Sequence, residues 1–170
     1  ENAIKFLTRA RAGDLANGEI LPNLGAAHRA AGRPDQAVEV LHEAISLASE
    51  NPSAYFNLAN AYVDVGNNDM ALQTYRQVIE LVPDHISAHG TVAQILRDAG
   101  DTDGALHEFD ILDTLAPDTP ETLNAIAVLH DGSGRLETAE EFLRRAVSLS
   151  SDNHEFASNL ANILARTFRT

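Results

Sequence analysis

Histidine is the residue type with the most evident chemical potential in this sequence, because an imidazole can bind a metal or carry a proton near neutral pH. Of the seven histidines, only His85 and His89 have a spacing that places two imidazoles on one face of a helix. His85 lies at the boundary between two of the sequence repeats described below. We interpret the histidines as structural residues and expect His28 and His130 at partly buried positions between helices.

Two short segments resemble known functional sites. Residues 101–104 with Asp110 echo a calcium-binding loop, but Ala99 stands at the first ligand position and the last position holds Asp instead of a bidentate Glu. Residues 130–134, of sequence HDGSG, contain the residue types of a hydrolase triad, yet neighbours within one turn need not reach the geometry of nucleophile, base and orienting carboxylate. The chain has no Cys and therefore no thiolate. We predict no catalytic residue, no metal site and no cofactor.

Composition and charge narrow the class of partner. The net charge of −13 disfavours nucleic acid and anionic lipid, which both require clustered Lys and Arg, and favours neutral or basic partners. The apolar fraction of 44% is enough to bury a core, and no stretch approaches the roughly 18 consecutive apolar residues of a membrane span. The sequence predicts a soluble, cytoplasmic protein without direct membrane insertion. Abundant Ala and a single lysine, Lys5, are typical of a GC-rich bacterium.

A period of 34 residues runs through the whole chain. Glycines recur at this spacing as Gly32, Gly66, Gly100 and Gly134. Small residues form two further columns, which are Ala3, Ala37, Ala71, Ala105, Ala139 and Gly25, Ala59, Ala93, Ala127, Ala161. Large apolar residues fill two more, which are Leu24, Leu58, Val92, Ile126, Leu160 and Leu7, Leu41, Tyr75, Phe109, Leu143. We expect the small residues where two helices approach closely.

Each repeat predicts two helices. Apolar residues at three- and four-residue spacing run from Tyr55 to Tyr62, and Gly66 then ends the helix in a left-handed conformation. A second apolar stripe runs from Ala71 to Leu81, before Pro83. An acidic residue opens every second helix, in keeping with the partial positive charge there: Glu1, Asp35, Asp69, Asp103 and Glu137.

These residues resemble a known family. Tyr55, Leu58, Ala59 and Tyr62, followed by Ala71, Tyr75 and Pro83, are similar to the tetratricopeptide pattern W-x2-L-G-x2-Y, A-x3-F, P. The resemblance implies an all-α fold, a right-handed α-α superhelix of antiparallel helical hairpins. It covers one domain of residues 1–170, with half-repeats at 1–17 and 154–170 and full repeats at 18–51, 52–85, 86–119 and 120–153. His28 and His130 replace an aromatic, and Ser49 and Ser151 replace the proline.

The phase of the repeats at the two ends suggests an excerpt from a longer protein. We expect the final half-repeat to expose an apolar face that more protein or a second copy covers. Its apolar residues are Phe156, Leu160, Ile163, Leu164 and Phe168.

Polar residues on another face of the first helices are the candidate binding residues. Asn57, Asn60 and Asp64 share such a face, and in tetratricopeptide arrays this face lines the concave groove that takes a peptide. By register, the candidate groove residues are Asn23, Phe56, Asn57, Asn60, Asp64, Thr91, Gln94, Arg97, Asp98, Asn124, Val128, Asp131, Asn159 and Asn162.

The candidate residues predict the kind of ligand. Asn23, Asn57 and Asn159 resemble the asparagine ladder of the O-linked N-acetylglucosamine transferase superhelix, which Thr91 and Ala125 interrupt here. Asn can donate to and accept from a peptide backbone at the same time. No Lys and Arg clamp for a terminal carboxylate stands on this face, whose corresponding places hold Phe56, Thr91, Glu121 and Ala125. A plain solvated polar face is the alternative.

Three functional hypotheses follow. The first is a scaffold for protein–protein interaction that binds a peptide or protein segment in the groove and is not an enzyme. The second is the substrate-recruiting arm of a larger bacterial enzyme, such as a glycosyltransferase, sulfotransferase or oxygenase. The third is a self-assembly module, a homo-oligomer formed through the terminal helices.

Overall fold

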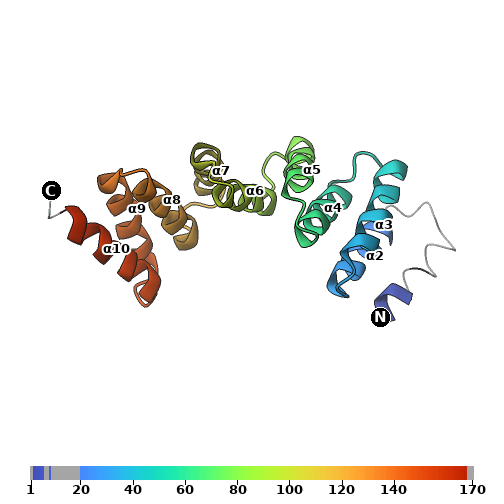
Figure 1. Cartoon of the computed structure of the whole chain (residues 1–170), viewed down its shortest axis with the longest axis horizontal. Coiled ribbons are helices and arrows are strands. Elements are labelled where there is room, and N and C mark those ends of the chain that lie inside the picture. Colours follow the sequence, from blue (N-terminus) through green and yellow to red (C-terminus); the bar gives the residue numbers. More distant parts are fainter. Residues whose placement is uncertain (1, 6–7, 9–19, 168–170) are drawn as a thin grey trace. The chain divides into compact units, whose positions relative to one another are not determined.

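The computed structural model describes residues 2–5, 8 and 20–167, and all regular structure within them is helical. Figure 1 labels the helices in chain order. They are α2 (Ile20–Ala30), α3 (Pro34–Leu47), α4 (Pro52–Asp64), α5 (Asn68–Leu81), α6 (Ile86–Asp98), α7 (Thr102–Leu115), α8 (Pro120–Gly132), α9 (Leu136–Leu149) and α10 (His154–Thr167). The all-α fold of helical hairpins is confirmed.

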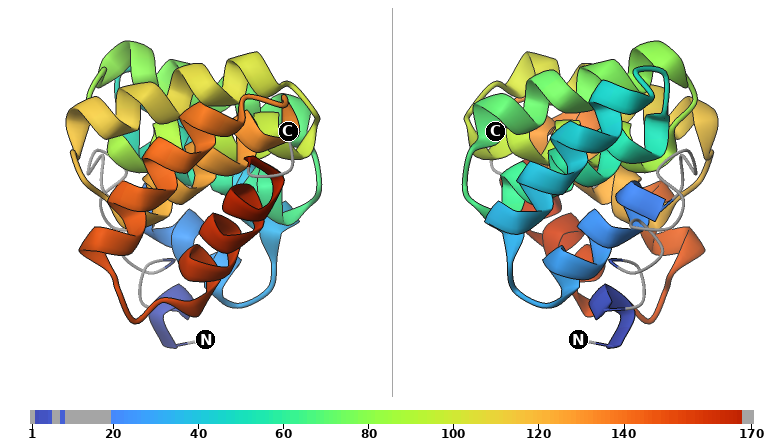
Figure 2. Two further views of the ribbon diagram at one scale, coloured as in Figure 1. Left: turned by 90° about the vertical axis from the view of Figure 1, so that its left-hand side faces the viewer. Right: turned by 90° about the vertical axis from the view of Figure 1, so that its right-hand side faces the viewer.

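The chain forms two compact units, and the boundary between them falls inside α6, between Ala88 and His89. Within each unit, consecutive helices run antiparallel and are joined by short turns (Figure 1 and Figure 2). The first helix of a hairpin also contacts the first helix of the next one: α2 contacts α4, and α8 contacts α10. This arrangement brings the candidate binding residues of neighbouring hairpins together within a unit. The single domain of residues 1–170 stays a prediction.

The turn inside each hairpin depends on glycine. Gly66 has φ +77°, a left-handed conformation that costs little only without a side chain. Its N–H donates to the carbonyl of Val63 (2.9 Å), and the next N–H, of Asn67, donates to the carbonyl of Tyr62 (2.8 Å). These bonds satisfy carbonyls at the end of α4. Gly32, Gly100 and Gly134 adopt the same positive φ, so the predicted left-handed turns are confirmed.

Helix starts follow their local sequence. The side chain of Asn51 accepts hydrogen bonds from the N–H groups of Ser53 (3.0 Å) and Ala54 (3.2 Å), and Pro52 occupies the first turn of α4. The predicted acidic residues lie in the first turns of the second helices, at Asp35, Asp69, Asp103 and Glu137. Glu1 lies outside the described residues.

Most residues of the small columns are buried between helices. Ala37, Ala71, Ala105 and Ala139 are fully buried, as are Ala59, Ala93 and Ala127. A Cβ atom placed on Gly25 would come within 2.4 Å of Cγ of Leu41, a residue that is itself fully buried. Burial at these positions agrees with the prediction of close helix contacts, whereas Ala3 and Ala161, the end members of the two columns, are exposed and do not agree with it.

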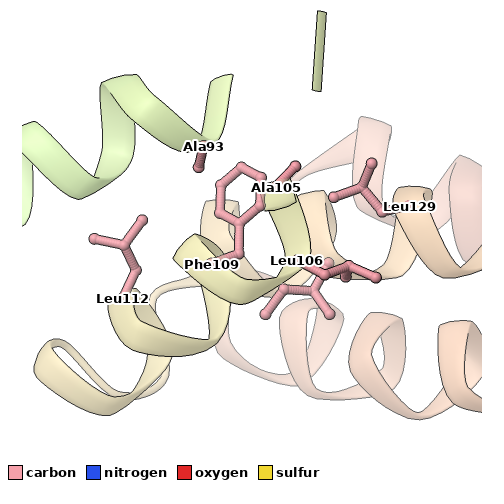
Figure 3. Close-up of a cluster of buried hydrophobic side chains, with 7 residues drawn as sticks. Ala93, Ala105, Leu106, Phe109, Leu112 and Leu129 are labelled. Carbon is pink, nitrogen blue, oxygen red and sulfur yellow. The ribbon is translucent and has the colours of Figure 1, made fainter. Parts of the chain in front are cut away.

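Large apolar side chains fill the space between the hairpins. In the second unit, Phe109 of α7 points toward Ala93 of α6, with Leu106 and Leu112 beside it (Figure 3). Ile126 and Leu129 of α8 complete this cluster and connect two successive hairpins. Such contacts between neighbours position the first helices that carry the candidate binding residues.

The expectation of an exposed apolar face on the final helix is wrong for two of its residues. Phe156 and Ile163 are each only 2% exposed, because they point from α10 into clusters formed with α8 and α9. Leu160 and Leu164 are half-buried. Phe168 lies outside the described residues, so the expectation is not tested there.

None of the described helices is long and apolar enough to cross a membrane.

Candidate functional site

In the first unit, two candidate residues connect neighbouring first helices. Asn57 of α4 donates from Nδ2 to the carbonyl of Pro22 in α2 (3.2 Å). Asp64 at the end of α4 forms an ion pair with Arg29 of α2, with 2.7 Å between Oδ2 and Nε. Asn23 is exposed on α2. Part of the hydrogen-bonding capacity of this face is thus used inside the protein.

Asn60 is held at both ends of its amide. Its Nδ2 donates to the carbonyl of Phe56 (2.9 Å), and its Oδ1 accepts from the hydroxyl of Tyr75 (2.8 Å). The half-buried ring of Phe56 packs against Tyr75 and His85, with centroid distances of 5.9 and 4.8 Å. These two residues form part of the packing between α4 and α5 and offer a ligand little free polar surface.

Helix α6 presents the next group of candidates. Gln94, Arg97 and Asp98 are exposed, and Arg97 Nε lies 3.2 Å from Oδ1 of Asp98. Thr91 is half-buried. Since neighbouring guanidinium and carboxylate groups neutralise each other, this end of α6 carries little net charge.

In the second unit, α8 and α10 are joined at both ends of their contact. Near the start of α8, Oδ1 of the buried Asn124 accepts from Nδ2 of Asn159 (2.9 Å), and its own Nδ2 lies 3.4 Å from Oε1 of Glu155. Near the end of α8, Asp131 forms an ion pair with Arg166 of α10. The amide of Asn124 therefore joins α8 to α10 and is less available to a ligand than the amide of an exposed asparagine.

Between these links lies a pocket of about 140 Å³. It brings together four of the predicted groove residues, which are Val128, Asp131, Asn159 and Asn162. Ala127, Leu143 and Ile163 complete its lining and are all buried. Asn162 is exposed, as is Val128 at 46%. The pocket thus combines an apolar floor with amide and carboxylate groups at its sides.

The ion pairs between first helices are a feature that our sequence reading missed. Arg29 pairs with Asp64, and Asp131 pairs with Arg166, so both pairs join residues 35 apart and the order of the charges is reversed. The sequence signal for these ion pairs was a pair of oppositely charged residues separated by one repeat period plus one residue. Ala127 and Leu143 were also missed as ligand contacts, because their columns predicted core packing alone, and Ile163 was missed because it was assigned to the apolar face of the final half-repeat.

The segments that resemble enzyme or metal sites have other partners. Ser133 donates from Oγ to the carbonyl of Leu129 (2.9 Å), while Asp131 is paired with Arg166, so the HDGSG segment does not form a triad. His89 is buried, and its Nδ1 lies 2.6 Å from Oε2 of Glu108. In the described part of the chain, no three His, Cys, Asp or Glu residues gather in a way that could hold a metal ion.

His28 and His130 are half-buried, as predicted. The ring of His130 stacks on Phe142 with centroids 5.9 Å apart and an interplanar angle of 15°. Burial lowers the pKa of His130, nearby Arg135 lowers it further, and Asp110 opposes both effects. The imidazole thus occupies the place of an aromatic in a hairpin contact.

Comparison with known proteins agrees with this architecture. Two sequence profiles described as tetratricopeptide repeat match residues 28–95 and 91–154, and together they cover more than half of the chain. No curated protein matches the sequence.

Solved structures with a similar fold are numerous. MamA from Desulfovibrio magneticus RS-1 has a TM-score of 0.79 at 20% identity, over 88% of this chain and 85% of that one. YrrB, described as a TPR protein with an unusual peptide-binding site, has a TM-score of 0.78 at 20% identity, over 95% and 83% of the two chains. TTC0263, a thermophilic TPR protein from Thermus thermophilus, has a TM-score of 0.65 at 21% identity, over 95% and 89%. With its 34-residue period, glycine turns and paired helices, this chain belongs to the tetratricopeptide repeat family.

Proposed function

We propose that this chain is a non-catalytic scaffold that binds an extended segment of a partner protein along α8 and α10. The tetratricopeptide repeat fold supports a role in protein–protein interaction in general. The observation that carries the specific proposal is the pocket of about 140 Å³, in which four predicted groove residues surround a buried apolar floor.

The lining suggests how a segment would bind. One apolar side chain of the partner would contact Val128, which is 46% exposed, so that apolar surface leaves water on both sides, and it would reach the floor formed by Leu143 and Ile163. The exposed amide of Asn162 can donate to and accept from the partner backbone. Arg166 balances the charge of Asp131 in this pocket, so the expectation of neutral or basic segments rests on the net charge of −13 of the chain.

The described peptide-binding site of YrrB lends support of a limited kind. YrrB shares the fold at 20% identity, so the likeness shows that a chain of this architecture can bind a peptide but transfers no contact residues. The candidate residues on α2, α4 and α6 stay proposed binding residues in their own right, apart from the segment bound along α8 and α10. They are Asn23, Phe56, Asn57, Asn60, Asp64, Thr91, Gln94, Arg97 and Asp98.

The test selects peptides from a random display library on the full chain and measures their Kd by fluorescence polarisation. We expect Asn162→Arg to weaken binding of selected peptides by about tenfold or more, because the larger cation removes an amide contact and repels basic segments. Asn162 is exposed, so this substitution should leave the melting temperature nearly unchanged.

The matched control is Ser148→Arg, which adds the same charge at an exposed position of α9. We expect this variant to bind the peptides with the affinity of the parent. Equal losses in the two variants would indicate a general effect of charge, and no loss in either would place the binding surface elsewhere.

A further inference from the structure

A second hollow lies in the first unit, on the side of the hairpins formed by α3 and α5. It encloses about 270 Å³, and we call it the α3–α5 slot. Its lining residues are His42, Ile45, Tyr55, Leu58, Tyr62, Met70, Gln73, Thr74 and Gln77. None of them belongs to the candidate groove, so the slot is a separate feature of the molecule.

Polar groups in the slot are largely bonded to one another. Thr74 donates from Oγ1 to the carbonyl of Met70 (2.7 Å), so its hydroxyl hydrogen is used within α5. The hydroxyl of Tyr62 lies 2.9 Å from Nε2 of His42. Aliphatic and aromatic surface consequently dominates the interior, and the exposed Gln73 and Gln77 stand at the edge.

In the hairpin of α8 and α9, side chains of the protein itself occupy the space that corresponds to the slot. Thr74 and Phe142 occupy the same place in the 34-residue repeat. The ring of Phe142 stacks on His130, which corresponds to Tyr62 of the slot. The guanidinium of Arg145, which corresponds to Gln77, lies 5.6 Å from the centroid of the Phe142 ring. In that hairpin an aromatic ring and a cation together fill the place that is open beside Thr74.

The two other described members of this column are also paired or packed, and Phe6 lies outside the described residues. Val40 packs against the buried cluster of Leu21, Ala44 and Ala54. Glu108 lies 2.6 Å from the buried imidazole of His89. Thr74 and Val40 are the two short side chains among the described members of the column, and Thr74 leaves beside it the space that the ring fills at Phe142.

The helices that wall the slot carry more acidic than basic residues. Helices α3 and α5 carry the carboxylates of Asp35, Glu39, Glu43, Asp69 and Glu80 and a single guanidinium, that of Arg76. An excess of negative charge on the helices that form the walls favours a ligand with cations next to its apolar anchor.

We infer that the α3–α5 slot binds a phenylalanine-sized aromatic side chain of a partner peptide in which Lys or Arg flanks the aromatic residue. The ring would take the place that Phe142 fills in its own hairpin, against Tyr62 and Met70. The flanking cations would face the carboxylates of α3 and α5. This inference is independent of the groove on α8 and α10.

The probe is the acetylated and amidated pentapeptide Gly-Lys-Phe-Lys-Gly, titrated into the full chain and followed by methyl NMR. We expect shifts at Ile45, Leu58 and Met70, which line the slot. Two control peptides replace Phe by Ala or both Lys by Glu. The alanine peptide should bind about tenfold more weakly, because it lacks the apolar surface of the ring, and the glutamate peptide should also bind more weakly.

Three variants test the location. Thr74→Phe reproduces the residue of the α9 hairpin and should abolish the shifts, whereas Thr74→Val preserves the open space and should retain them. Ile45→Lys places a cation beside the slot at a half-buried position and should weaken binding even if Thr74→Phe proves unstable. Circular dichroism and melting curves verify the fold of each variant.

Several outcomes would overturn the inference. They are equal binding of the phenylalanine and alanine peptides, shifts that persist in folded Thr74→Phe, or loss of binding in Asn162→Arg instead. Concentration-dependent shifts without peptide that vanish in Thr74→Phe would identify a second copy as the occupant. Failure of the groove proposal leaves these readouts unchanged, since they arise from different residues.

Discussion

At the scale of single residues, His130 is a titratable side chain whose role is to pack between helices. Its Nδ1 is buried and has no hydrogen-bond partner among the described residues, and its ring stacks on Phe142. Burial and Arg135 lower the pKa of this imidazole below its usual value of 6.5. The family pattern has an aromatic residue here, so the neutral imidazole fills a position suited to an uncharged ring.

The lowered pKa predicts a pH-dependent stability. Below pH 6.5, His130 binds a proton more readily in the unfolded chain than in the folded chain. The free energy of unfolding therefore decreases as the pH falls from 6.5 toward the folded-state pKa. We expect His130→Phe to lack this contribution. Its melting temperature should fall less than that of the parent between about pH 7.5 and about pH 5.5 in scanning calorimetry.

The control for this experiment is His107→Asn, which removes a histidine at an exposed position of α7. It should follow the parent across the same pH range. Parallel curves for the parent and His130→Phe would show that the buried imidazole does not contribute.

At the scale of helices, the distance between two packed helices depends on a few positions that hold glycine or alanine. Gly25 of α2 lies against Leu41 of α3, and a Cβ atom there would come within 2.4 Å of Cγ of Leu41. Gly90 of α6 is also inside a helix, but the nearest atom to its Cβ position is Cδ1 of Leu112 at 3.9 Å. Packing therefore requires glycine at position 25, whereas no steric contact requires glycine at position 90.

The two glycines predict substitutions of opposite sign. Gly25→Ala should lower the free energy of unfolding by on the order of 1–3 kcal/mol, because the fully buried Leu41 must move. Gly90→Ala should raise it by about 0.5–1 kcal/mol, because alanine restricts the unfolded chain and suits a helix interior. Urea denaturation of both variants measures the difference. A stabilised Gly25→Ala variant would refute the close approach of α2 and α3.

At the scale of the whole molecule, stability is distributed over contacts between neighbouring elements. Buried clusters join α8 with α6 and α7, and others join α9 and α10 to α8. Repeat proteins of this kind have stabilities that resemble a sum of repeat terms and nearest-neighbour terms. The division of the chain into two compact units at Ala88 and His89 agrees with such local coupling.

Local coupling predicts where a destabilised variant opens. In Gly25→Ala, amide hydrogen exchange followed by mass spectrometry should show faster exchange in α2 and α3, with much smaller changes in α9 and α10. Helix α3 packs against α2, whereas α9 belongs to the other compact unit. A uniform acceleration along the chain would mean that the protein unfolds as one cooperative body.

The sequence by itself determined the hairpins, their turns and their contact positions. A left-handed turn is a property of a single residue, so Gly66 and its equivalents marked the helix ends without knowledge of the fold. The columns of small residues repeat every 34 positions and identify close contacts for the same local reason. Family membership followed from these columns, since the same packing problem recurs in each repeat.

Only the tertiary structure decided which side chains are available to a ligand. Asn124 and Asn162 look alike in sequence, but Asn124 is bonded to Asn159 across the helix contact while Asn162 is exposed. Phe156 looked available in the final half-repeat and is buried. The pocket on α8 and α10 and the α3–α5 slot are spaces left between several helices, so their existence depends on the combined sizes of side chains that are distant in sequence. The repeat pattern of the sequence predicts where helices contact each other. It does not predict where their side chains leave a hollow between the helices.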